Sequence, residues 1–243
     1  MGNKQITIKI ADICIGIKLL NEDFYELCSY YETNDDADFV LAATESDLEE
    51  ERNQIATYTE EGYYSDTDVE RLWLLRQIAE KVPEYDAFLI HGASFRVDED
   101  AYLLLGPSGA GKTTQSKLWK KYFGERMRMI NDDKPILRML GDSIIVGASP
   151  WCGKENWNNN ITAPLKGIVS INQAKDNKIE PVSSQTAWDL VMNQVHRSKN
   201  PKTMQKIMRM IDSMIETTPV YRLECNREFE AVRIAYDALS KRG

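Results

Sequence analysis

A glycine-rich segment between an apolar run and an amphipathic run constrains the fold of this chain more than any other feature. It follows Leu105 and matches the pattern Gly-x-x-x-x-Gly-Lys-[Ser/Thr] in full. Its residues are Gly106, Pro107, Ser108, Gly109, Ala110, Gly111, Lys112, Thr113 and Thr114. Glycines permit positive φ, so successive N–H groups of such a loop can turn into one concavity. A helix that follows adds free N–H groups and its positive dipole end at the same place. The spacing therefore predicts a strand, a loop and a helix whose junction binds an anion.

The residue types in this segment predict a nucleotide phosphate site, with ATP as the expected ligand. Lys112 is expected to reach the β- and γ-phosphates, and the Thr113 hydroxyl is expected to bind Mg²⁺. An ordinary glycine-rich turn is the alternative interpretation. The full match between an apolar run and a helix-like run disfavours it.

Composition excludes several other classes of protein. The 243 residues, 42% of them hydrophobic, can build one large domain or two small ones. A formal net charge of −8 argues against a nucleic-acid binder and against a protein of anionic membrane surfaces. The four cysteines show no Cys-x-x-Cys pair, no apolar run approaches membrane-spanning length, and the N-terminus lacks a signal-peptide profile. These features predict a cytoplasmic protein.

Hydrophobic patterning divides the chain into an N-terminal β-rich subregion, 1–66, and a phosphate-loop domain, 67–243. Alternating isoleucines predict strands between residues 4 and 20, whereas the acidic stretch 45–68 is typical of an exposed loop or edge. A helix is expected from about residue 66 to Pro83. Further strands are predicted at 87–90, 93–97, 101–105, 128–130, 135–138, 144–146, 165–171 and 220–223, and further helices at 186–197, 201–217 and after Asn226.

Asp132 and Asp133 are the leading candidates for catalytic carboxylates. They follow a short apolar segment downstream of the phosphate loop. Two adjacent carboxylates at a strand end can divide their roles, one holding Mg²⁺ and the other facing an acceptor hydroxyl. An isolated acidic turn is the alternative. Glu155 is a weaker candidate for a metal ligand, and His91 by itself favours a structural role.

The loop 149–160 contains Trp151 and Trp157 beside Glu155. It can fold over the phosphate site, where its tryptophans would exclude water and its polar residues would bind an acceptor. It can equally be a surface connection anchored by tryptophan burial. The sequence leaves both interpretations open.

The order of these motifs resembles the catalytic domain of HPr kinase/phosphorylase, in a short variant. The resemblance rests on His91-Gly92-Ala93, the turn at 98–100, the segment from Leu104 to Thr113 and Asn131-Asp132-Asp133, and it covers about residues 87–137. The closing segment 219–225 also resembles the tail of the short HPr-kinase-like proteins. The resemblance to this family implies a phosphoenolpyruvate carboxykinase-like fold, in which a P-loop lies on a mixed, strongly twisted sheet with flanking helices.

The resemblance also implies roles for individual residues. His91 becomes an active-site neighbour, Asp132 the general base, and Asp133 its metal-side or orienting partner. Lys112 joins them as a catalytic residue, and the metal ligands would be Thr113, Asp133 and Glu155. The same resemblance raises the prospect of a homo-oligomer.

Three functions follow from these observations. The first is a kinase that uses ATP and Mg²⁺ to phosphorylate a hydroxyl, on Ser or Thr of a peptide or protein or on a small molecule. The second is a regulatory module or ATPase that binds ATP without phosphorylating an acceptor. The third, a GTPase switch, requires Asn-Lys-x-Asp, which the nearest string at 172–176 does not match. The carboxylate pair favours the kinase.

Overall fold

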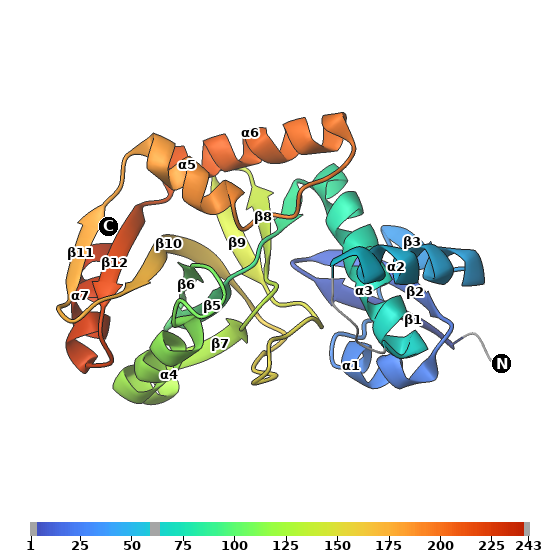
Figure 1. Cartoon of the computed structure of the whole chain (residues 1–243), viewed down its shortest axis with the longest axis horizontal. Coiled ribbons are helices and arrows are strands. Elements are labelled where there is room, and N and C mark those ends of the chain that lie inside the picture. The colour runs from blue at the N-terminus through green and yellow to red at the C-terminus, as the bar shows by residue number, and fades with distance from the viewer. Residues whose placement is uncertain (1–3, 59–63, 241–243) are drawn as a thin grey trace. The chain divides into compact units, whose positions relative to one another are not determined.

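The structure, a computed structural model, describes residues 4–58 and 64–240 of the chain. The chain divides into two compact units, Met1–Val82 and Pro83–Gly243. The helices are α1 Tyr25–Ser29, α2 Glu45–Tyr58, α3 Asp66–Lys81, α4 Lys112–Phe123, α5 Ser184–Met192, α6 Pro201–Thr217 and α7 Phe229–Ser240 (Figure 1). The strands are β1 Lys4–Ile10, β2 Ile13–Leu19, β3 Phe39–Ala42, β4 Ala87–Leu89, β5 Ala93–Val97, β6 Asp100–Leu105, β7 Met127–Asn131, β8 Ile136–Leu140, β9 Ser143–Gly147, β10 Thr162–Gln173, β11 Lys178–Pro181 and β12 Val220–Cys225. No helix in the described ranges is both long and apolar enough to cross a membrane.

The described residues of the first unit form a three-stranded sheet in which β2 lies between β1 and β3. β1 and β2 pair antiparallel, and β3 runs parallel to β2. Ile6, Ile8 and Ile10 alternate with polar residues and are buried, as expected for a strand with one face on a core. The strands predicted between residues 4 and 20 are confirmed.

The prediction of an exposed loop or edge over residues 45–68 is wrong, because α2 occupies Glu45–Tyr58. Glu, Leu, Arg and Gln fill much of this segment and are good helix formers. Its start is capped reciprocally. The Thr44 hydroxyl accepts from the Asp47 N–H (3.2 Å), and the Asp47 carboxylate accepts from the Thr44 N–H (2.8 Å). Residues 59–63, which the same prediction covers, lie outside the described residues.

The boundary between the units falls after Val82 and not after residue 66 as predicted, so α3 belongs to the first unit. Glu70 of α3 is buried, and its carboxylate accepts the backbone N–H groups of Leu20 (2.7 Å) and Asn21 (2.8 Å) just beyond β2. Periodicity predicts the helix correctly, but it cannot identify the sheet on which the helix packs.

Within the described residues, the second unit contains a nine-stranded mixed sheet. Its strands follow the order β4-β8-β9-β10-β6-β5-β7, and β12 pairs with both β10 and β11. The first residues of β10 pair antiparallel with β9, whereas its later residues pair in parallel with β6 and β12. One long strand therefore changes neighbours along its length, and the sheet curls around it. The mixed α/β class expected from the sequence is confirmed.

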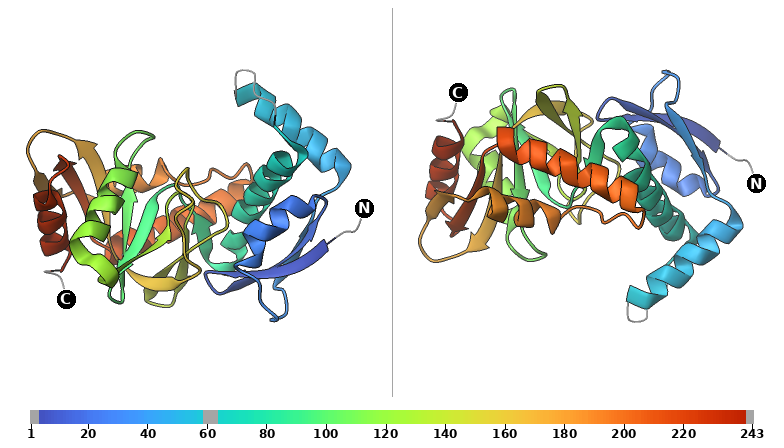
Figure 2. Two further views of the ribbon diagram at one scale, coloured as in Figure 1. Left: turned by 90° about the horizontal axis from the view of Figure 1, so that it is seen from below. Right: turned by 90° about the horizontal axis from the view of Figure 1, so that it is seen from above.

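Helices cover both faces of this sheet. α4 and α7 pack together on one side, and α5 and α6 lie together on the other (Figures 1 and 2). The core beneath α4 and α7 contains Trp119, whose ring centroid lies 4.8 Å from that of Phe95 and 5.5 Å from that of Tyr102. Tilted aromatic contacts of this kind stabilise the packing beyond simple burial. They fix α4 on the sheet and hence the position of the loop that precedes it.

The strand order brings separate chain segments to one edge of the sheet. β5 is antiparallel to β6 and β7, so the start of β5 lies beside the ends of those two strands. His91 precedes β5, the glycine-rich loop follows β6, and Asp132 follows β7. β10 and β12 run parallel to β6, so their carboxyl ends lie at the same edge. Motifs far apart in the sequence therefore become neighbours.

Candidate active site

The loop 106–111 joins β6 to α4, and its glycines explain its shape. Gly106 has φ 153°, and a Cβ atom there would lie 2.8 Å from the Cβ atom of Ala110. Gly111 caps α4 in the left-handed conformation with φ 105°. Side chains larger than hydrogen rarely adopt these angles without strain. The strand, loop and helix predicted from the sequence are confirmed.

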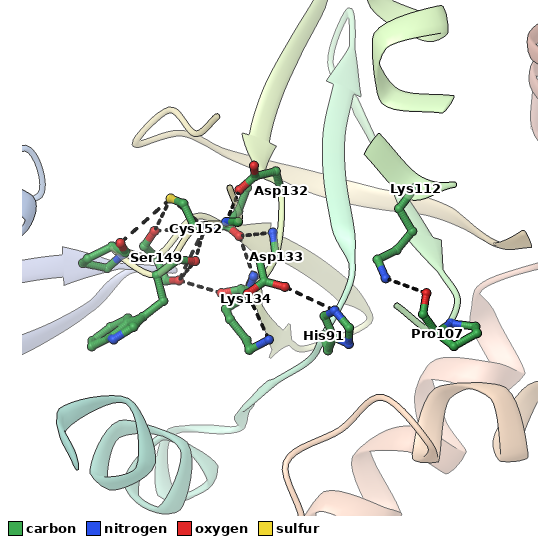
Figure 3. Close-up of polar contacts among 12 residues, drawn as sticks. His91, Pro107, Lys112, Asp132, Asp133, Lys134, Ser149 and Cys152 are labelled. Atoms are coloured by element: carbon green, nitrogen blue, oxygen red, sulfur yellow. Dashed lines mark hydrogen bonds and ion pairs between the residues drawn. The ribbon is translucent and has the colours of Figure 1, made fainter. Parts of the chain in front are cut away.

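Lys112, the first residue of α4, folds back over this loop. Its Nζ atom donates to the carbonyl oxygen of Gly106 at 2.7 Å. It also donates to the carbonyl oxygen of Pro107 at 3.4 Å (Figure 3). Burial lowers the pKa of Lys112, and the charge of Asp133 opposes that shift. Loop N–H groups, a helix N-terminus and an ammonium group are thus gathered in one place. That donor set fits a chain of phosphate groups.

Asp132 is held by the backbone of the loop 149–160. Its Oδ1 atom accepts the Gly153 N–H at 2.7 Å, and its Oδ2 atom accepts the Trp157 N–H at 3.4 Å. Burial raises the pKa of Asp132 above its ordinary value, and these two hydrogen bonds offset only part of that rise. A positioned carboxylate with a raised pKa is suited to accept a proton.

Asp133 instead contacts two cationic or donor side chains (Figure 3). Its Oδ1 atom lies 3.2 Å from His91 Nε2, and its Oδ2 atom accepts from Lys134 Nζ at 3.0 Å. Burial by itself would raise the pKa of Asp133, but the His91 hydrogen bond and the Lys134 charge bring it below its ordinary value. The Asp133 carbonyl also accepts the Gly92 N–H at 3.0 Å. His91 therefore contacts the second carboxylate directly.

Asn131 positions both carboxylates, although the sequence analysis did not select it as a site residue. Its fully buried amide oxygen accepts the N–H groups of Asp133 (2.8 Å) and Lys134 (2.6 Å). Its amide nitrogen donates to the carbonyl oxygens of Ser149 (2.9 Å) and Trp151 (3.2 Å). One side chain thus joins the turn that carries the carboxylates to the loop that holds Asp132. The available signal was its place before a turn, where asparagine commonly bonds the backbone two residues on.

The loop 149–160 is anchored by its two tryptophans. Trp151 is 2% exposed, and Trp157 packs against the core cluster beneath α4 and α7. The N–H of Asn159 donates to the Ile130 carbonyl at 3.1 Å, so the loop runs along the end of β7. These contacts support the interpretation of an anchored loop. Its role as a wall against water stays a prediction.

The three predicted metal ligands lie on α4, in the turn after β7 and in the loop 149–160. Glu155 pairs with Lys117 at 2.9 Å, and both side chains are about half exposed. Thr113 is exposed in the first turn of α4, and the charge of Asp133 acts on the adjacent Lys112. Among residues 4–58 and 64–240, no group of three or more His, Cys, Asp or Glu side chains is arranged to hold a metal ion. The set of Thr113, Asp133 and Glu155 stays a prediction.

Comparison with known proteins gives little help. No family model matches the sequence, and no curated protein matches it. Among solved structures, the Hpr(Ser) kinase/phosphatase from Coxiella burnetii is similar at 11% sequence identity and a TM-score of 0.36, over 64% of this chain and 99% of that chain. A likeness this distant assigns neither a family nor a function.

Proposed function

We propose that this chain is an ATP-dependent kinase that transfers the γ-phosphoryl group to a hydroxyl, on Ser or Thr of a peptide or protein or on a small molecule. The observation that carries this proposal is the position of the phosphate loop and the two carboxylates at one edge of the sheet. A phosphate loop alone supports nucleotide binding. A held carboxylate two strands away at the same edge of the sheet adds a group that can deprotonate an acceptor.

In this proposal the loop 106–111 and the first turn of α4, through Thr114, bind the phosphates of ATP. Backbone N–H groups would surround them, and the Lys112 ammonium would move from the loop carbonyls to the β- and γ-phosphates. Mg²⁺, held by Thr113 and Asp133 with Glu155 as a third ligand, would neutralise charge on the phosphates. The lowered pKa of Asp133 supports this assignment, because it keeps that carboxylate ionised.

Asp132 is the proposed general base. The acceptor hydroxyl would give its proton to the Asp132 carboxylate while its oxygen bonds to the γ-phosphorus, and the bond from that phosphorus to the departing ADP would break. The hydrogen bonds from Gly153 and Trp157 support the role because they fix the carboxylate. Its raised pKa also supports the role, since a base works best when its pKa approaches the working pH.

The test is a panel of acceptors read by labelled phosphate. The protein is incubated with γ-labelled ATP and Mg²⁺ and with free serine, serine-containing peptides or an HPr-like protein. We expect slow release of free phosphate without an acceptor and labelling of at least one panel member. Fast release of free phosphate with no labelled acceptor would instead identify an ATPase and contradict the kinase.

Two variants make this test specific to the loop. Lys112→Ala removes a charge-assisted contact with phosphate and is expected to weaken ATP binding by about 1.5–3 kcal/mol. Lys121→Ala removes the same charge from an exposed position at the far end of α4 and should leave ATP binding unchanged. Equal ATP affinity in both variants would place the nucleotide elsewhere.

A further inference from the structure

Beside the phosphate loop lies a cavity that the proposed reaction does not use. Its volume is about 230 Å³, and it lies where the carboxyl ends of β10 and β12 meet the start of α4. It is lined by Ala110, Gly111, Thr114, Gln115, Ile171, Gln173, Ala174, Cys225, Asn226 and Arg227. Pockets for drug-sized ligands measure about 300–1,000 Å³. The cavity therefore suits one part of a nucleotide and not a whole one.

Gln115 lines this cavity and carries a buried hydrogen-bond acceptor without a partner. The residue is 2% exposed, and its Nε2 atom donates to the Asn226 carbonyl at 2.9 Å and contacts Cys225 Sγ at 3.2 Å. These contacts fix the amide plane. No donor among the described residues reaches the buried Gln115 Oε1 atom. A buried acceptor without a partner is unfavourable, so a bound group that brings a donor would be stabilised there.

The cavity and the phosphate loop share a wall. Ala110 and Gly111 belong to the loop and Thr114 to the first turn of α4, and all three line the cavity. Gln173, at the end of β10, lines the cavity too and donates from Nε2 to the Gly109 carbonyl at 2.7 Å. A ligand in this cavity would therefore lie directly against a chain of phosphates on the loop.

The strand order fixes the direction of such a ligand. β6, which leads into the phosphate loop, has β10 on one side and β5 on the other. The cavity lies on the β10 side, whereas His91, Asp132 and Asp133 lie on the β5 and β7 side. A nucleotide has its nucleoside at one end of the phosphates and its transferable phosphoryl group at the other. Crevices at the carboxyl ends of parallel strands are where α/β sheets bind such ligands.

We infer that this cavity binds the nucleoside of the nucleotide, with Gln115 Oε1 accepting a hydrogen bond from the 6-amino group of the base or the 2′-hydroxyl of the sugar. The inference rests on the proposed function, because it assumes that the loop holds the phosphates. The inference also places the γ-phosphate on the β5 and β7 side of the loop, where Asp132 and Asp133 lie. The phosphate loop then provides affinity for any polyphosphate, and the cavity provides the preference for a nucleotide.

The experiment compares ATP with inorganic tripolyphosphate, each with Mg²⁺, by calorimetry. Tripolyphosphate has the phosphates without the nucleoside. The unmodified protein should bind ATP at least about tenfold more tightly. Ala174→Phe, which fills the cavity from the end of β10, should remove that advantage while tripolyphosphate binding is retained. Ala174→Leu should give a smaller loss, and Ala56→Phe, exposed on α2, should give none.

The results distinguish a failure of the proposed function from a failure of the inference about the cavity. If neither ligand binds, the proposed function fails. If Ala174→Phe keeps both tripolyphosphate binding and the full preference for ATP, the nucleoside lies elsewhere and the inference is overturned. If Ala174→Phe binds neither ligand, the Ala174→Leu variant is used instead. The inference is then overturned if Ala174→Leu keeps both tripolyphosphate binding and the full preference for ATP.

Two ATP analogues test the role of Gln115. One is 2′-deoxy-ATP, and the other is the purine riboside triphosphate that lacks the 6-amino group. At least one should bind the unmodified protein about fivefold or more weakly, because it leaves the buried acceptor unpaired. Equal binding of ATP and both analogues would contradict the role of Gln115.

Discussion

Asp132 and Asp133 are adjacent in the sequence, yet their surroundings shift their pKa values in opposite directions. Burial acts on both carboxyl groups and would raise both values. Asp132 receives only neutral backbone N–H groups, so the rise prevails. Asp133 has His91 and Lys134 as partners, and these prevail over burial. Environments that separate the pKa values of two carboxylates are typical of sites that assign them different roles.

Asp132→Asn is expected to lower phosphoryl transfer by about 10²–10⁴-fold, the usual contribution of a general base. ATP affinity should stay unchanged, because a base acts on the acceptor. The amide oxygen can still accept the Gly153 N–H, so the loop should keep its position. Initial transfer rates and ATP titrations of both proteins give the measurement. Asp142→Asn, an exposed change in the β8–β9 turn, is the matched control. Normal turnover of Asp132→Asn would remove this residue from the mechanism.

The pH dependence of the same reaction provides a second readout. The carboxylate of Asp132 can accept a proton only while it is ionised, so transfer should fall as the pH falls through its pKa. Because that pKa is raised, the acid limb should lie above the ordinary aspartate value of about 3.9. Asp132→Asn should lose this limb from its residual rate.

Among the elements, the loop 149–160 is joined to the carboxylate turn by one side chain, that of Asn131. Asn131→Ala removes four hydrogen bonds and leaves buried partners unsatisfied, so it should destabilise the second unit by about 2–4 kcal/mol. Transfer should also fall, because Asp132 loses its fixed position. Denaturant unfolding followed by tryptophan fluorescence measures the stability, since four of the five tryptophans lie beyond Val82.

Asn159→Ala is the matched control for that variant. Asn159 lies in the same loop, and its amide donates one hydrogen bond, to the Met129 carbonyl at 2.7 Å. Its loss should lower the free energy of unfolding by about 1 kcal/mol and leave transfer intact. If Asn131→Ala is no more harmful than this control, the asparagine does not organise the site.

The elements also show what the sequence could and could not predict. α6 was predictable because an apolar stripe follows the Asn200 cap and an N-terminal proline. α2 was not, since its polar composition masks good helix propensity. β11 was also not predicted, because it is mostly exposed and pairs only at the sheet edge with β12. Sequence motifs predicted the loop between β6 and α4, and the binding of phosphate there and the roles of the two carboxylates stay predictions. Asn131 and Gln115 act through partners distant in the chain, and local pattern does not reveal such contacts.

At the scale of the whole molecule, each unit has its own sheet and its own buried residues. The core cluster beneath α4 and α7 is drawn from residues between Ala93 and Leu239. The isoleucines of β1 and β2 are buried within the first unit together with Glu70 of α3. Domains with separate cores can in principle fold alone. The position of the boundary then decides which fragments are stable.

A fragment of residues 83–243 should therefore fold by itself. It keeps the nine-stranded sheet formed by the described residues, the core cluster and every predicted site residue. We expect one cooperative thermal transition, within about 4 °C of the corresponding transition of the full chain. That difference in melting temperature corresponds to about 1 kcal/mol at this size.

A fragment of residues 67–243 is the comparison, because it retains α3 without the sheet that covers it. Its buried face, with Trp73, Leu74 and Ile78, would be exposed, so this longer fragment should bind an apolar dye and aggregate on heating. Scanning calorimetry and dye fluorescence on both fragments measure the difference. If 67–243 folds cooperatively and 83–243 does not, α3 belongs with the second unit and the division after Val82 is wrong.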